Sequence, residues 1–318
     1  MPSLFPITAD GYRPHPLHAG ERDWPEANCY ADLWIEVLHT MGREPLACLA
    51  FTVAVDFECD QWTFFKPPLA DLSRLYGIEV QELNVWDRLH EHVAAQICGG
   101  RLALVEVDSF WLPDTAGTSY RTQHTKTGIG MAAIDGETLG YFHNGGYYAL
   151  GAEDFRGIFR LDDTGTHLPP YVELARLDGP AVSDENLTAE AEALLRLHVQ
   201  RRPRRSPFEA FAASLPAELS RLRAEGLGRF HRYAFATLRQ AGAAFELGAV
   251  FLRWLGSRGV DGLGEAATEL ASISTTAKAM QFRLARAAAG RTVDVTESLA
   301  TMDAAWQRGL GALRARYG

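Results

Sequence analysis

The sequence has few cysteines, no long apolar runs and no excess of positive charge, and each shortage excludes a class of protein. Four cysteines are too few for a disulfide framework in 318 residues, and no two of them form a Cys-x-x-Cys pair. No apolar run could span a bilayer, and the opening MPSLFPITADGYRPHP lacks the features of a signal peptide. The net charge of −9 argues against nucleic-acid binding. We therefore expect a cytoplasmic protein that binds neither membranes nor nucleic acid.

The chain falls into two parts of different character. Residues 1–168 hold most of the Trp and Tyr and show mixed patterns, whereas residues 182–318 read almost entirely as helix. Gly, Pro and Asp are frequent between them, over residues 162–188, as in a connection between domains. The stretch SDEN then supplies the capping and acidic residues of a helix start. We predict one domain over 1–168 and an all-α domain over 182–318.

Local patterns in the first domain predict helices followed by antiparallel strands. Apolar residues at three- and four-residue spacing indicate the first helix, and the Asp135-Gly136 pair indicates a hairpin turn. The expected elements are helices over 29–41, 69–77 and 85–100, and strands over 78–84, 101–112, 126–134 and 137–143. The apolar segment 47–57 is either a strand or a buried stretch. This order predicts an α+β domain whose helices are segregated from an antiparallel sheet.

Cys29 begins the first helix, where it is either a buried structural residue or a nucleophile. The N–H groups and dipole of a helix N-terminus stabilise a thiolate, and the orphan N–H of Cys29 could bind an oxyanion. Asn28 either caps the helix or contacts a substrate. The other three cysteines, Cys48, Cys59 and Cys98, lie in or beside an apolar segment or at a helix end, so we expect them in the core or in a cap.

A thiol nucleophile also needs a base and an acceptor that orients the base. His124 lies in a polar loop just before the hairpin, and the second hairpin strand ends in His143 and Asn144. Because a hairpin brings its ends together, Asn144 is predicted to orient His124, with His143 as the alternative. Asp108 is either an orienter, a substrate contact or a strand-terminating residue. Tyr120 either lines the site or packs.

The order of a helix-start cysteine, a histidine before a hairpin and an asparagine after it resembles the papain-like cysteine peptidase superfamily. The stretches NCYADLWIEVLH, LALVEVDSFWLPDT and GYFHNGGYY resemble more closely a non-proteolytic branch that includes the acyltransferase of butirosin biosynthesis. The whole chain is similar to a bacterial family of unknown function that occurs beside synthetase-like enzymes charging amino acids onto carrier proteins. The resemblance implies a papain-like first domain.

The resemblance also implies a reaction, in which Cys29 takes an acyl or aminoacyl group from a thioester and passes it to a small amine. His124 would act as the base and Asn144 as its orienter. The donor would be the phosphopantetheine arm of a carrier protein, with no bound cofactor, and no metal spacing is present. Papain-type sites carry a glutamine before the cysteine as an oxyanion donor. None precedes Cys29, so the second donor stays open.

Two other functions fit the same residues: a cysteine peptidase or amidase with water as the acceptor, and a non-catalytic binding protein on the same fold. The helical domain would shape the acceptor pocket or dock the carrier protein. One dense basic run stands out on this acidic chain, and it is either a docking surface for an acidic carrier or a solvated helix end. Its members are Arg201, Arg202, Arg204 and Arg205.

Overall fold

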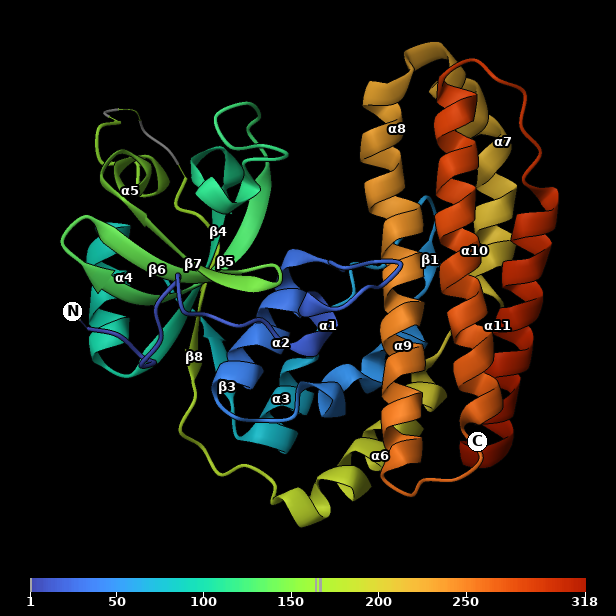
Figure 1. The fold of residues 1–318 in the computed structure, drawn as a ribbon, viewed down its shortest axis with the longest axis horizontal. Helices are drawn as coiled ribbons and strands as arrows, with labels where there is room; N and C mark the ends of the chain where they lie inside the picture. Colours follow the sequence, from blue (N-terminus) through green and yellow to red (C-terminus); the bar gives the residue numbers. More distant parts are fainter. Residues whose placement is uncertain (1, 164, 166–167) are drawn as a thin grey trace. The chain divides into compact units, whose positions relative to one another are not determined.

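The computed structural model describes residues 2–163, 165 and 168–318 and divides into two compact units (Figure 1). The sheet unit comprises Met1–Gly20, Asn28–Pro45 and Pro68–Val182. The helical unit comprises Glu21–Ala27, Leu46–Pro67 and Ser183–Gly318. The predicted fold class is confirmed, because an antiparallel sheet with a helix beginning at Cys29 is followed by an all-helical region.

The sheet unit is built on one six-stranded antiparallel sheet, with the strand order β3-β8-β4-β5-β6-β7. Its strands are β3 (Glu79–Glu82), β4 (Arg101–Asp108), β5 (Lys126–Asp135), β6 (Thr138–His143), β7 (Gly146–Gly151) and β8 (Val172–Arg176). The expected hairpin is β5–β6, and Gly136 in its turn has φ 55°. Between β4 and β5, Glu106 pairs with Gly128 and Asp108 with Lys126.

Helices cover both faces of this sheet (Figure 1). They are α1 (Pro16–Ala19), α2 (Cys29–Thr40), α3 (Leu69–Tyr76), α4 (Leu89–Cys98) and α5 (Ala152–Ile158), with 3₁₀ turns over Ser109–Trp111 and Pro113–Thr115. A Cβ on Gly130 would lie 3.2 Å from Leu33 Cδ1, so α2 approaches β5 closely. Ile129 points the other way, into a core with residues of α4 and α5. The helix α2 and the pair α4 and α5 therefore occupy opposite faces.

The helical unit contains α6 (Asp184–Arg201), α7 (Pro207–Glu225), α8 (Leu227–Ala234), α9 (Gln240–Ser257), α10 (Gly264–Ala288) and α11 (Thr296–Tyr317), with a π-helical turn over Phe235–Arg239. It also takes in part of the N-terminal half. A 3₁₀ segment, Pro45–Ala54, is followed by the short strands β1 (Phe57–Glu58) and β2 (Gln61–Trp62). The ring of Trp62 lies 5.1 Å from that of Phe208. The apolar segment near residue 50 is therefore buried, but it is not a strand.

The structure differs from the sequence-based prediction over residues 162–188, which were expected to form a connection between the two domains. This stretch contains β8, which lies between β3 and β4 in the sheet. Residues 164, 166 and 167 of the connection lie outside the described residues. The strand β7 and the helix α5 were also not expected. A short strand such as β8 is fixed by the neighbours with which it pairs, so its own composition predicts it poorly.

Gly77 ends α3 in the left-handed conformation, with φ +66°. A Cβ there would lie 2.4 Å from the backbone carbon of Gly179, which cannot move aside as a side chain could. We expect Gly77→Ala to lower the free energy of unfolding by about 2 kcal/mol, through backbone strain and overpacking. Urea denaturation measures this. Gly99→Ala, at the C-cap of α4, is the control, because Gly99 has negative φ and its Cβ would make contacts of 3.4 Å. Equal losses in both variants would contradict the prediction.

Candidate active site

Cys29 is the first residue of α2, and Asn28 is its N-cap. The side-chain oxygen of Asn28 accepts hydrogen bonds from the backbone N–H groups of Tyr30 at 3.2 Å and Ala31 at 3.0 Å. Asn28 therefore caps the helix. Neither the thiol nor the backbone N–H of Cys29 forms a hydrogen bond with any residue that the structure describes. The first turn of α2 thus leaves one N–H donor and a half-buried thiol for another partner.

The thiol of Cys29 lies against β5. A Cβ on Gly128 would be 3.9 Å from Sγ. Directly paired residues of an antiparallel ladder share a face, as do residues two apart on one strand. Glu106, Asp108 and Lys126 therefore lie on the sheet face that Cys29 contacts. Among these, Lys126 Nζ pairs with Glu106 Oε1 at 2.7 Å.

His124 immediately precedes this end of β5. Its Nδ1 lies 2.6 Å from Asp108 Oδ2, and its ring stacks on Phe110 at 4.5 Å with an interplanar angle of 12°. Asp108 is fixed in turn, because its Oδ1 accepts the backbone N–H groups of Phe110 and Thr125. A carboxylate on Nδ1 sets the ring tautomer and leaves Nε2 free to exchange a proton. The side chain of His124 is 73% exposed.

Asn144 does not take the position expected for it. It lies in the tight turn between β6 and β7, with φ 45°, next to Gly145. A Cβ on Gly145 would lie 2.7 Å from His18 Cγ, so this turn packs against His18 and not against His124. The acceptor on His124 is Asp108, one of the alternatives that the sequence left open.

His143 lies on the opposite face of the sheet from Cys29. Its Nε2 is 2.9 Å from Thr127 Oγ1, and its Nδ1 is 2.5 Å from Asp114 Oδ2. Thr127 neighbours Gly128 along β5 and so points away from Cys29. Tyr141 also donates to Asp114, at 2.5 Å. His143 therefore does not orient His124, because it belongs to a buried polar network of its own.

A cavity of ≈ 1260 Å³ opens beside His124. Asp108, Lys126 and Trp111 also line it, whereas Cys29 and Tyr120 do not. The hydroxyl of Tyr120 instead donates to Asp154 Oδ2 at 3.1 Å, so this residue anchors its loop to α5. The cavity could hold a substrate within reach of the imidazole of His124.

Cys29 and His124 are not hydrogen-bonded to each other. One two-residue step along β5, about 7 Å, separates Gly128 from Lys126, and His124 lies beyond it. The expectation that the thiol and the ring lie within hydrogen-bond reach is therefore not met in this structure. They are linked through Asp108, which holds His124 and which the β4–β5 register places on the sheet face that Cys29 contacts, next to the Lys126–Glu106 ion pair.

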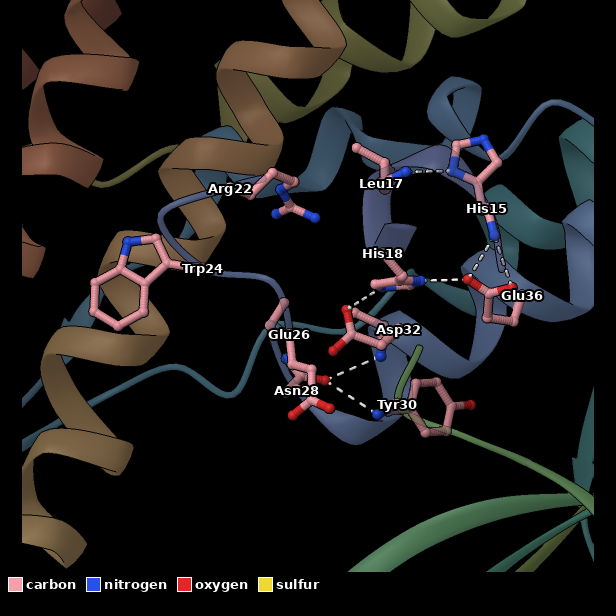
Figure 2. A network of polar contacts seen from close by, with 12 residues as sticks. His15, Leu17, His18, Arg22, Trp24, Glu26, Asn28, Tyr30, Asp32 and Glu36 are labelled. Atoms are coloured by element: carbon pink, nitrogen blue, oxygen red, sulfur yellow. Dashed lines mark hydrogen bonds and ion pairs between the residues drawn. The ribbon is translucent and has the colours of Figure 1, made fainter. Parts of the chain in front are cut away.

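The sequence interpretation missed a buried ion network on α2 (Figure 2). His18 Nε2 lies 3.2 Å from Asp32 Oδ1, and its Nδ1 contacts Glu36. Tyr12 donates to Glu36 Oε2 at 2.5 Å, and the backbone N–H of His15 also reaches this carboxylate, at 3.1 Å. The sequence did contain a signal for this network. Asp32 and Glu36 lie four residues apart on a largely buried helix, and buried acids need a cation or hydrogen-bond donors.

Burial and charge act in opposite directions on this network. Burial alone would lower the pKa of His18, but hydrogen bonds and charge from Asp32 and Glu36 outweigh it and raise the pKa to about 9. Burial would likewise raise the pKa of Glu36, but hydrogen bonds from His18 and Tyr12 lower it. His18 is therefore a cation at neutral pH, held between two carboxylates. With both ring nitrogens engaged, it is poorly placed to act as a base.

The basic run lies in the helical unit, at the end of α6 and just beyond it. Arg202 donates to the carbonyl of Val199 at 2.7 Å, and burial followed by the charge of Arg314 lowers the pKa of Arg202. The other three arginines are exposed. Across the described ranges, no group of three or more His, Cys, Asp and Glu side chains is arranged to hold a metal ion.

Residues 13–177 match the DUF1839 N-terminal domain, and residues 184–315 match the DUF1839 C-terminal domain. The chain belongs to the DUF1839 family. This is a two-domain family of unknown function, and its two matched regions divide the DUF1839 chain just after β8. No curated protein matches the chain. No helix within the described residues is long and apolar enough to cross a membrane.

Proposed function

We propose that this DUF1839 protein is a cysteine-dependent acyltransferase. One observation carries the proposal: the thiol and N–H of Cys29, unpaired among the described residues, lie against the sheet face that carries Asp108, and Asp108 holds His124. A nucleophile, an oriented base and an oxyanion donor are the parts that acyl transfer needs. The resemblance to papain-like acyltransferases supports the same assignment.

In the proposed reaction, His124 accepts the thiol proton and Cys29 attacks the carbonyl carbon of a thioester. The carbon–sulfur bond of the donor breaks, and the departing thiolate takes the proton from His124. A small amine then attacks the acyl-cysteine and passes its proton to His124, which returns it to the sulfur of Cys29. An amide is formed and the enzyme is restored. Asp108 holds the ring throughout, and the N–H of Cys29 stabilises the oxyanion.

This chemistry requires His124 to approach Cys29 when substrate is bound. His124 lies in the loop before β5, and its ring is largely exposed, so it can move without breaking a strand. Catalytic hydrogen bonds are often long or absent in free enzymes and form only with substrate. By resemblance, the donor is an acyl or aminoacyl group on the phosphopantetheine arm of a carrier protein. The basic run beginning at Arg201 is the docking surface in this proposal.

The proposal is tested by incubating the protein with an aminoacyl thioester of pantetheine and measuring intact mass. We expect one acyl group per chain, located at Cys29 after digestion. His124→Gln and Asp108→Asn should slow acylation by about 10²- to 10⁴-fold, because each impairs the base. Tyr120→Phe is the control, since Tyr120 bonds to Asp154 and does not line the cavity. Acylation at normal rates in the His124 variant would contradict the assigned base.

The acceptor distinguishes transfer from hydrolysis. With a mixture of small amines present, a transferase forms amides, whereas a peptidase or amidase releases free acid whatever amine is added. If no acyl-enzyme forms with any thioester, the acyltransferase proposal is rejected.

A further inference from the structure

The cavity beside His124 contains more charge than the proposed chemistry uses. Trp86, at its wall, is 80% exposed, and four basic residues line the same space. An aromatic surface near several cations suits a small ligand that has an apolar part and an anionic part. Which of these cations are available depends on the ion pairs they already form.

Most of the charges in the cavity neutralise one another. Lys126 pairs with Glu106 and Arg156 with Asp162, while Asp108 is hydrogen-bonded to His124. Glu153 pairs with Arg121, which lies outside the cavity lining. The remaining two acids, Asp87 and Asp163, accept the backbone N–H groups of Arg88 and Gly165, each at 2.8 Å.

Two basic residues of the cavity lining, Arg88 and Arg160, are not part of these ion pairs. Neither guanidinium forms a hydrogen bond or an ion pair with any described residue, and both are exposed. Arg160 follows α5 with φ 53°, in the left-handed conformation that glycine adopts most readily at a helix end. An arginine there costs backbone strain, and no hydrogen bond or ion pair of its side chain with a described residue offsets that cost.

We propose that the cavity binds a small substrate through an anionic group, a carboxylate or a phosphate, held by Arg88 and Arg160, with Trp86 against its apolar part. Guanidinium groups recognise both anions with charge-assisted, often bidentate hydrogen bonds. This inference rests on the proposed function in one respect, namely that the bound ligand is the substrate on which Cys29 acts. Binding itself is independent of the thiol.

Isothermal titration calorimetry with three aromatic probes tests this site: benzoate, phenyl phosphate and the neutral benzamide. We expect at least one anionic probe to bind about tenfold more tightly than benzamide, and rising sodium chloride to weaken it. Arg88→Ala and Arg160→Gly should each weaken that probe about tenfold. Arg160→Gly should do so with an unchanged or raised melting temperature, because glycine relieves the strained backbone. A loss of binding without a loss of stability excludes a general folding defect.

Arg43→Ala is the matched control, since Arg43 is an exposed arginine of the sheet unit outside the cavity lining. Binding of phenyl phosphate alone assigns a phosphate, and binding of benzoate alone assigns a carboxylate. Equal affinity for benzamide, no binding of either anion, or equal effects of all three arginine variants would overturn the site. Titrating a Cys29→Ala chain separates the two proposals. Anion binding there with no acyl-enzyme in the parent chain rejects only the acyltransferase, whereas acylation without anion binding rejects only this site.

Discussion

A Cys29→Ser variant is expected to form no detectable acyl-enzyme and to lose acyl transfer by a factor on the order of 10⁴ or more. The replacement keeps the size of the side chain and its place at the first turn of α2, so the fold should be retained. A serine hydroxyl ionises far less readily than a thiol, and a helix N-terminus cannot make up that difference. Single-turnover release of pantetheine from the thioester, with intact mass in parallel, measures the loss.

Cys98→Ser is the control for this experiment, because Cys98 is an exposed cysteine that ends the helix α4 instead of beginning a helix. It should leave acylation unchanged. Labelling of the parent chain by iodoacetamide at mild pH should be fastest at Cys29, ahead of Cys98 and the exposed Cys59. Acylation of the Cys29→Ser chain, or equal labelling of the three thiols, would show that Cys29 is not the nucleophile.

Removal of His18 is expected to destabilise the sheet unit strongly. The side chains of Asp32 and Glu36 are fully buried, and His18, 3% exposed, is the cation between them. His18→Ala leaves two buried carboxylates close together, so we expect a loss of about 3–5 kcal/mol in the free energy of unfolding. Urea denaturation at pH 6 measures it. The control, His39→Ala, removes a partly exposed histidine of α2 and should cost under about 1 kcal/mol.

The same ion network predicts a pH dependence of stability. Because the pKa of His18 is about 9 in the folded chain against about 6.5 in an unfolded one, its contribution is fully present below pH 6.5. That contribution, roughly 3 kcal/mol, is lost as the pH rises through 9. We expect the parent chain to lose this stability between pH 6.5 and 9 and the His18→Ala chain to lose much less. Parallel pH profiles for the two chains would contradict the network's role.

Several elements were predictable because their determinants are local. The helix α2 follows from apolar spacing and an Asn cap, α3 from a left-handed glycine at its end, and the β5–β6 hairpin from Asp135-Gly136. Other elements depend on distant partners. The strand β8 is held between β3 and β4, which come earlier in the chain, and no feature of its own five residues specifies that place.

The candidate site shows the same division. The sequence alone identified Cys29 as a helix-start thiol and His124 as a loop histidine, since both properties belong to the immediate neighbourhood of each residue. It predicted Asn144 as the partner of His124, and this was wrong, because the partner is Asp108. This pairing depends on the β4–β5 register, which places Asp108 opposite Lys126 at the point where the His124 loop joins the strand.

The sequence by itself determined the α+β class, the helical second half and the position of the candidate thiol, because each arises from residue patterns a few positions long. Only the tertiary structure decided which charges meet. It placed His143 on the far face of the sheet with Asp114, and it buried His18 against α2. It also left Arg88 and Arg160 in one cavity with no hydrogen-bond or ion-pair partner for either guanidinium among the residues it describes. The energies of buried and paired charges depend on separations in space, and sequence distance does not specify these.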